Sequence, residues 1–295
     1  MKFKSFVLEN NLGTVLENHS FKELTTIGCG GKIKYVYLPN DITSLCEAYR
    51  YIKSNNYKYA VLGNGSNILA SDNDYNGIVI LLKKLEYSYS ILDNNTICVS
   101  AFYPTIKLAY DLANNELGDL SFLGGIPGLL GGAIYNNSGA YNDSISNHVI
   151  EVKYIDTAGN IKTISNLGCA FGYRKSIFHY IEGIIIECSL RVEKIITKEK
   201  LEKRRRKRQE SQPLENKSMG SVFKNNPLIP SWKIIDALGL RGLRIGDASI
   251  SAKHANFIIN LGSAKSSDII SIIDLIETRS RLEFGINLSK EITII

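Results

Sequence analysis

A glycine-rich segment between residues 124 and 140 constrains the fold of this chain most strongly. It holds six glycines in seventeen residues, and every glycine that becomes ordered loses much conformational entropy. Apolar side chains are interleaved with these glycines, so a mobile surface loop is the less favoured alternative. A backbone without side chains is useful where it lies against a flat or charged ligand, and we expect a buried loop system that contacts a cofactor.

A second glycine turn, Gly63-Asn64-Gly65-Ser66-Asn67, directly follows a strand-like run at 59–62. Small residues let consecutive backbone N–H groups converge on phosphate oxygens. The residues from 68 to 75 lack helical spacing, so the turn does not match the dinucleotide fingerprint. Taken alone, this loop is equally well interpreted as an ordinary turn. Two such segments, far apart in the chain, together suit one large phosphorylated cofactor.

Hydrophobic spacing predicts a mixture of short strands and helices. Helices are expected over 42–54, with Leu45, Ala48, Tyr49 and Ile52 on one face, and from about 267 to 282, with Ser266 or Ser267 as the cap. The apolar face of the latter holds Ile269, Ile272, Ile273 and Ile276. Further helices are expected at 105–115, 198–209 and 232–237, and strands at 35–38, 59–62, 78–82, 96–101, 149–156, 161–164, 184–192, 257–260 and 291–295.

Length and composition indicate a globular protein of two or three domains. The chain has 295 residues, 44% of them hydrophobic and 22% charged, and a formal charge of +6 that mildly favours anionic ligands. Its five cysteines form no C-x-x-C pair, which predicts reduced thiols in a cytoplasmic protein without a metal site. No signal peptide is expected, and the uncharged stretch 120–142 is too rich in glycine and polar residues to span a membrane.

A basic run from Lys203 to Arg208 lies in the predicted helix 198–209, which is the best domain boundary. It lacks interleaved aromatic residues, so a solvated linker helix is favoured over a nucleic-acid site. Such a helix would also attract anionic ligands.

Three further motifs follow the glycine segment in a distinctive order. They are Phe171-Gly172-Tyr173-Arg174-Lys175-Ser176, Gly220-Ser221-Val222-Phe223-Lys224-Asn225 and Lys253-His254-Ala255-Asn256-Phe257. In this order, from about residue 21 to 295, the chain resembles the UDP-N-acetylenolpyruvoylglucosamine reductases of peptidoglycan synthesis. No tyrosine-bearing insertion separates Tyr173 from Ser221, so it is similar to the shorter subtype.

The resemblance implies an α+β protein that binds FAD non-covalently and uses NADPH as hydride donor. It implies an FAD-binding fold of the vanillyl-alcohol-oxidase (PCMH) type in two subdomains, at 1–85 and 86–197, with the terminal strand near 291–295 joining the first. An α+β UDP-sugar-binding domain is expected at 198–290. A monomer is expected, with no nucleic-acid partner and no membrane insertion.

The resemblance also assigns site residues. Arg174 corresponds to the catalytic arginine, Ser221 to the proton donor and Glu291 to the catalytic glutamate. Substrate binding is expected from Tyr173, Lys224, Asn225 and His254. Cofactor binding is expected from Gly63, Asn64, Gly65, Ser66, Asn67, Ile126, Pro127, Gly128, Gly131, Gly132, Asn137 and Gly139. Taken singly, the three catalytic residues would be interpreted as a surface ion pair, a turn hydroxyl and a strand-edge charge.

The chain departs from the family pattern in places. Asn142 stands where the family usually has another glycine, and Ser289-Lys290 precede Glu291 where Glu-Pro is more usual. Two other functions remain open at this point. A related flavin oxidase acting on a sugar or alcohol would share the glycine segments without needing Arg174, Ser221 and Glu291, and a non-catalytic basic binding protein would bind no flavin.

Overall fold

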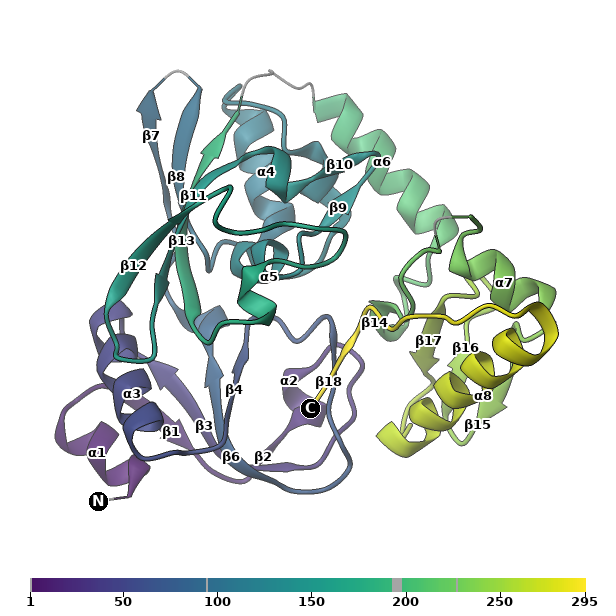
Figure 1. Ribbon diagram of the computed structural model, residues 1–295, viewed down its shortest axis with the longest axis horizontal. Helices are drawn as coiled ribbons and strands as arrows, with labels where there is room; N and C mark the ends of the chain where they lie inside the picture. The colour runs from purple at the N-terminus through teal and green to yellow at the C-terminus, as the bar shows by residue number, and fades with distance from the viewer. Residues whose placement is uncertain (1, 94, 193–197, 227) are drawn as a thin grey trace. The chain divides into compact units, whose positions relative to one another are not determined.

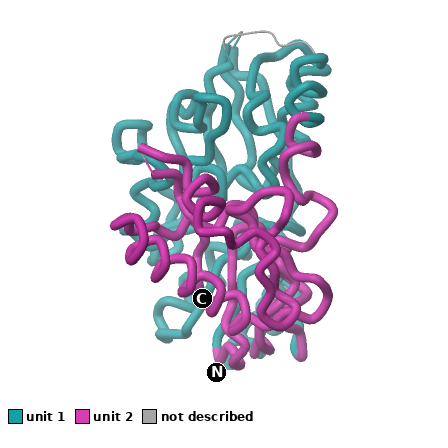
Figure 2. Tube along the Cα trace, turned by 90° about the vertical axis from the view of Figure 1, so that its right-hand side faces the viewer, with its two compact units in different colours: residues 1–17, 35–64, 77–206 teal, residues 18–34, 65–76, 207–295 magenta. Residues whose placement is uncertain are grey.

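The computed structural model describes residues 2–93, 95–192, 198–226 and 228–295, which form a mixed α+β fold (Figure 1). The chain divides into two compact units, each assembled from separate stretches of sequence (Figure 2). Unit 1 consists of Met1–Glu17, Tyr35–Asn64 and Gly77–Arg206. Unit 2 consists of Asn18–Lys34, Gly65–Asn76 and Lys207–Ile295. The threefold division expected from the sequence stays a prediction.

One sheet has the strand order β1-β3-β6-β4, with the short β2 paired to β3. Its strands are β1 (Gly13–Leu16), β2 (His19–Ser20), β3 (Lys32–Pro39), β4 (Tyr59–Leu62) and β6 (Tyr75–Leu81). The helices α1 (Phe3–Glu9), α2 (Phe21–Leu24) and α3 (Ile42–Ser54) belong to the same part of the sequence. Asp41 caps α3 by accepting a hydrogen bond from the Ser44 N–H at 2.7 Å. The predicted apolar face of α3 is confirmed, since Leu45, Ala48, Tyr49 and Ile52 are all fully buried.

A second large sheet, which lies in unit 1, is antiparallel and has the order β12-β11-β13-β8-β7 (Figure 1). Its strands are β7 (Tyr89–Asp93), β8 (Thr96–Ser100), β11 (Val149–Ile155), β12 (Ile161–Ser165) and β13 (Ile184–Arg191). The intervening elements are η1 (Leu82–Lys84), α4 (Thr105–Asn114), η2 (Ser121–Gly125), α5 (Leu130–Tyr135), β9 (Gly139–Ala140), β10 (Asp143–Ser144), η3 (Ile145–Asn147) and η4 (Ile177–His179). One continuous apolar core joins side chains of both sheets, among them Tyr37, Ile80, Val99 and Ile186.

The prediction of a loop at 120–142 is partly wrong, because this segment contains the helix α5. Leu130, Ala133 and Ile134 follow the i, i+3, i+4 spacing of a helix and are all buried. This helical pattern is short and interrupted by glycines, and for that reason the sequence did not indicate a helix here.

Unit 2 contains an antiparallel sheet with the order β14-β17-β16-β15. Its elements are β14 (Lys217–Ser221), α7 (Ser231–Ala237), β15 (Arg244–Ile245), β16 (Ala248–Ile250), β17 (Phe257–Asn260) and α8 (Ser266–Phe284), and α6 (Lys198–Ser211) leads into it. The predicted face of α8 is confirmed, since Ile269, Ile272, Ile273 and Ile276 are buried in one core. The C-terminal β18 (Thr293–Ile294) runs parallel to β5 (Ile68–Leu69) in the same unit.

The predicted cap of α8 is wrong. Lys265 occupies the N-cap position, and the Asp72 carboxylate accepts hydrogen bonds from the Ser266 and Ser267 N–H groups at 2.8 and 2.9 Å. A carboxylate at a helix N-terminus satisfies its unpaired N–H groups and its positive dipole end. A cap supplied from nearly two hundred residues away leaves no local sequence signal.

None of the described helices combines the length and apolar character that a bilayer-spanning helix requires. Among these same residues, no group of His, Cys, Asp and Glu side chains is arranged to hold a metal ion. All five cysteines are free thiols.

Candidate active site

The two glycine segments meet within unit 1. A Cβ at Gly63 would lie 3.1 Å from Leu129 Cδ1, so a side chain there would push the segments apart. In unit 2, Gly65 has a φ of +63°, and a Cβ would meet the Leu24 backbone carbonyl. Close backbone approach therefore requires glycine at position 65, whereas Gly63 packs tightly against the Leu129 side chain.

Thr105, at the start of α4, holds the glycine-rich segment 124–140 in place. The Thr105 N–H and Oγ1 donate to the Gly128 carbonyl at 3.1 and 3.2 Å, and Thr105 Oγ1 also donates to the Ile126 carbonyl. These bonds fix the backbone around Pro127. A Cβ at Gly131 would lie 3.1 Å from Ala101 Cβ, whereas a Cβ at Gly132 would meet no protein atom within 4 Å. Gly132 thus presents bare backbone next to open space, as a cofactor cradle requires.

Arg174 lies in a tight turn of unit 1. Gly172 and Lys175 exchange backbone hydrogen bonds of 3.0 and 3.2 Å across the turn, and Arg174 between them has a φ of +55°. A non-glycine residue in this left-handed region is uncommon and costs about 1 kcal/mol or more. The guanidinium lies 5.1 Å from the centre of the Tyr173 ring, and its Nη2 donates to the Gly139 carbonyl at 3.0 Å.

Asn137 links this turn to the glycine segment. It is buried, its Nδ2 donates to the Gly172 carbonyl at 2.9 Å, and its Oδ1 accepts from the Ser146 N–H at 3.2 Å. Beyond it, β9 and β10 form a hairpin whose turn residues Tyr141 and Asn142 have φ values of +57° and +61°. Asparagine tolerates this left-handed conformation, which explains how Asn142 replaces a glycine.

Ser221 ends β14 in unit 2. It pairs with Phe257 of β17, and the register shifts between Ser218 and Ser221. Gly220 lies within this irregularity with a φ of +77°. Such a bulge re-aims the side chain that follows it, so Ser221 lies at a point where the strand leaves regular pairing.

Glu291 lies on the segment that pairs with the residues after Ser221. Its N–H donates to the Val222 carbonyl at 2.8 Å, and the Lys224 N–H donates to the Ser289 carbonyl at 2.8 Å. The structure therefore brings two of the three predicted catalytic residues onto neighbouring segments of unit 2, with Glu291 just before β18. Arg174 belongs to unit 1.

The predicted substrate-binding residues near Ser221 also have structural partners. The Lys224 carbonyl accepts from Ser231 Oγ, and Asn225 Oδ1 accepts from the Ser231 N–H at 3.3 Å. Ser231 begins α7, so these bonds anchor the motif to that helix. The side chain of Lys224 remains partly exposed.

His254 is held in one tautomer. Its Nδ1 accepts a hydrogen bond from the Asn256 N–H at 3.3 Å, so in the neutral ring Nε2 carries the proton. Burial, reinforced by the positive charge of Arg241, lowers the pKa of His254 below its ordinary value. A neutral ring with an Nε2–H donor is the result.

Asn256 is a positioning residue that was not assigned from the sequence. It is almost fully buried, with Oδ1 accepting from the Phe223 N–H at 2.9 Å and Nδ2 donating to the Phe223 carbonyl at 2.7 Å. This two-point clamp fixes the backbone two residues after Ser221. A polar residue immediately before the apolar run 257–259 was the available signal.

The basic helix α6 is only partly a solvated linker. Leu201 is buried in the core of unit 1, Lys200 pairs with Asp119 at 2.7 Å, and the Arg204 guanidinium lies 4.6 Å from the centre of the Tyr141 ring. Lys203, Arg206 and Lys207 are exposed.

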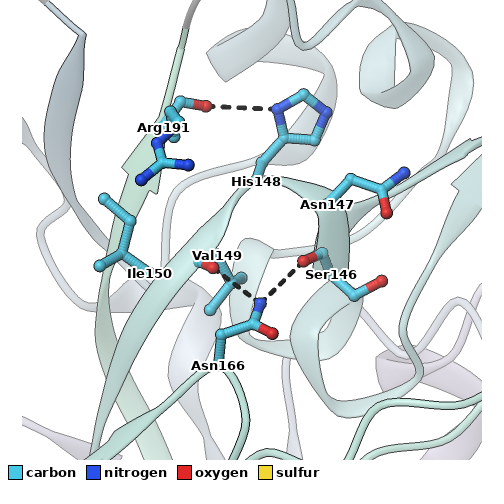
Figure 3. Close-up of a pocket in the computed structure, with 7 residues that line it drawn as sticks. All are labelled: Ser146, Asn147, His148, Val149, Ile150, Asn166 and Arg191. Atoms are coloured by element: carbon cyan, nitrogen blue, oxygen red, sulfur yellow. Dashed lines mark hydrogen bonds between the residues drawn. The ribbon is translucent and has the colours of Figure 1, made fainter.

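A separate cavity of ≈ 370 Å³ lies in unit 1 (Figure 3). It is lined by Ser146, Asn147, His148, Val149, Ile150, Asn166 and Arg191. Asn166 Nδ2 donates to the Ser146 and Val149 carbonyls at 2.8 and 2.7 Å, and closes one side. None of the residues predicted for catalysis, cofactor or substrate lines this cavity.

Comparison with known proteins finds two family models that match different parts of the chain. Residues 33–165 match the family model described as FAD binding domain, and residues 212–295 match UDP-N-acetylenolpyruvoylglucosamine reductase, C-terminal domain. A curated UDP-N-acetylenolpyruvoylglucosamine reductase of Halalkalibacterium halodurans is 34% identical over 96% of this chain and 95% of its own length.

Solved structures with a similar fold include a reductase of the same name. The UDP-N-acetylenolpyruvylglucosamine reductase of Thermus caldophilus superposes with a TM-score of 0.77 at 29% identity, covering 96% of this chain and 98% of that one. A chitooligosaccharide oxidase shares the fold alone, with a TM-score of 0.51 and 13% identity over 65% of this chain and 43% of its own. The predicted α+β fold, with an FAD-binding domain followed by a C-terminal domain, is confirmed. The chain belongs to the UDP-N-acetylenolpyruvoylglucosamine reductase family and is an FAD-dependent oxidoreductase.

Proposed function

We propose that Arg174, Ser221 and Glu291 carry out the NADPH-dependent reduction of the enolpyruvyl ether of UDP-N-acetylglucosamine enolpyruvate, giving UDP-N-acetylmuramate for peptidoglycan synthesis. The observation that carries this proposal is the pairing of the Glu291 N–H with the Val222 carbonyl at 2.8 Å. It places a carboxylate residue beside the residue that follows the proposed proton donor. Arg174, held in an uncommon backbone conformation, adds the positive charge that the substrate carboxylate requires.

The residues of this chain fit FAD as the resident cofactor. Gly63, Gly65 and Gly132 keep their backbone free of side chains at places where a Cβ would clash or fill open space. Glycine N–H groups at such turns bind phosphate oxygens. When bound, FAD supplies a hydride that originates from NADPH.

Arg174 stabilises the charge that the reduction creates. Addition of hydride to the terminal carbon of the enolpyruvyl group moves negative charge into the carboxylate. A guanidinium presents several donors in a fixed fork and binds that carboxylate most strongly as the charge grows. Glu291 either orients this arginine or, when protonated, donates to the carboxylate, and both roles stabilise the same charge.

Ser221 donates the proton that completes the reaction. A hydroxyl is a weak acid, but the carbon next to an enolised carboxylate is strongly basic, so position matters more than acidity. The bulge at Gly220 and the Asn256 clamp on Phe223 fix the backbone on both sides of this hydroxyl. Lys224, Asn225 and His254 would contact the UDP-sugar, and Tyr173 would line the site beside Arg174.

An experiment that follows the two half-reactions one after the other tests the proposal. The purified protein is mixed with NADPH without air, which should bleach the visible flavin absorbance. Addition of the enolpyruvyl UDP-sugar should then restore the absorbance and yield the saturated product. A flavin that is bleached but not restored by this substrate overturns the proposal and favours a related oxidase.

A further inference from the structure

We infer that Lys290 is a positioning residue, whose ion pair with Glu277 holds Glu291 in the register that catalysis requires. This inference rests on the proposed function and extends it to two residues outside the proposed catalytic, cofactor-binding and substrate-binding sets. Lys290 Nζ lies 2.7 Å from Glu277 Oε1 and 2.9 Å from Oε2, so the ammonium meets both carboxylate oxygens. Both side chains are about one-third exposed (34% and 29%), and the pair is therefore partly shielded from water.

The backbone around Lys290 defines which way its side chain points. Phe223 and Lys290 form an antiparallel bridge, flanked by the Lys224–Ser289 and Glu291–Val222 hydrogen bonds. In this arrangement the bridged residues are a non-hydrogen-bonded pair, whose side chains lie close together on one face. Phe223 is fully buried in the core that also contains Ile276 of α8. Lys290 therefore faces α8, where it forms the ion pair with Glu277.

The residues around Lys290 alternate between the two faces of the extended segment. Leu288 and Ile292, two residues away on either side, are buried in the same core. Successive side chains of an extended segment lie on opposite faces, so Glu291 is directed away from α8. The direction of the catalytic carboxylate is thus set by three neighbours that face the core.

The ion pair discriminates between registers. A slip by one residue would exchange the two faces of the segment. Glu291 would then lie opposite Glu277, and two carboxylates in a partly buried place repel each other. Glu277 therefore favours the native register through Lys290 and disfavours the slipped register through Glu291.

Lys290→Met tests this role, because it keeps the length of the side chain and removes the charge. We expect bleaching of the flavin by NADPH to be unchanged and reoxidation by the UDP-sugar to slow about 10-fold, since small misplacements of a reacting group cost this much or more. Lys290→Arg should restore the rate, and Glu277→Gln should repeat the loss. Equal reoxidation rates in wild type and in both charge-removing variants overturn the inference.

Arg279→Met is the matched control. It removes another ion pair of α8, between Arg279 Nε and Glu283 Oε1 at 2.6 Å, and should leave both half-reactions unchanged. Equal slowing in this variant would assign the effect to a loosened helix and overturn the inference. Lys290→Met should also add no further slowing in a Glu291→Gln background, because the two residues act through one carboxylate. Additive slowing overturns the inference, whereas a wild type that fails to be reoxidised overturns the proposed function itself.

Discussion

Asn67 Nδ2 donates a hydrogen bond to the backbone carbonyl of Glu291 at 3.2 Å, and the Asn67 carbonyl accepts from the Thr293 N–H at 2.9 Å. Asn67 ends the glycine turn 63–67, and Glu291 is the proposed catalytic carboxylate. Directly beyond them, β5 and β18 pair in parallel. The end of the proposed cofactor turn and the backbone of Glu291 therefore cannot shift independently within unit 2.

Ser221→Ala should separate the two half-reactions. NADPH should still bleach the flavin, because the serine hydroxyl takes no part in that step. Reoxidation by the enolpyruvyl UDP-sugar should slow at least about 100-fold, which is typical for loss of a positioned acid. Rapid-mixing absorbance measurements follow both steps. Ser218→Ala, on the same strand, is the control and should behave as wild type. Near-normal turnover of Ser221→Ala would remove this hydroxyl from the mechanism.

Arg174→Gly should increase stability while slowing the reduction of substrate. Glycine adopts the φ of +55° without the steric cost that arginine bears, so the free energy of unfolding should rise by as much as about 1 kcal/mol. The loss of the guanidinium should slow substrate reduction by about 100- to 1000-fold. Denaturant unfolding and steady-state kinetics measure the two effects. A fully active Arg174→Gly variant would contradict the proposed role, and a destabilised one would show that the Gly139 hydrogen bond outweighs the backbone strain.

Local patterns were sufficient to predict several of the regular elements, although α1, α5 and the strands β14, β15 and β16 were missed. The bounds of α3 and β17 coincide with those read from the sequence, because apolar spacing and flanking polar residues mark both ends. The cap of α8 was missed for the opposite reason. Its acceptor, Asp72, is distant in the chain, and nothing near Ser266 reveals it.

The candidate site shows the same contrast between features with a local sequence signal and features that depend on distant contacts. Glycine-rich turns can be recognised in the sequence because glycine is the one residue type without a side chain. The roles of Arg174, Ser221 and Glu291 came from the order of the motifs, since none of these residues is distinctive alone. The Asn256 clamp on Phe223 and the pairing of Lys290 with Glu277 depend on register and tertiary packing, which one sequence does not specify.

Gly132→Ala should weaken FAD binding without harming the fold. Its Cβ would meet no protein atom within 4 Å, and alanine in a helix such as α5 is favoured over glycine by about 1 kcal/mol. The apoprotein should therefore be as stable as wild type or more so, while the added methyl group intrudes on the cofactor. We expect the dissociation constant for FAD, measured by fluorescence titration, to rise at least about 10-fold, a loss of about 1.4 kcal/mol.

Gly131→Ala is the contrasting neighbour. Its Cβ would lie 3.1 Å from Ala101 Cβ, so this variant should lose stability even without cofactor. Unchanged FAD affinity in Gly132→Ala would remove Gly132 from the predicted cofactor residues.

His254 should make the protein less stable in mild acid. Its pKa in the folded state is lowered from the ordinary value of 6.5 by burial and by Arg241, so the unfolded chain binds the proton more readily. Stability from the neutral ring is then fully present above about pH 6.5 and is lost as the pH falls through this value towards the folded pKa. The free energy of unfolding, measured by denaturant titration between about pH 7.5 and 5.5, should fall across this window. In His254→Gln the fall should be smaller, whereas His19→Gln should retain it. An identical pH dependence in wild type and His254→Gln would show that other groups cause the loss.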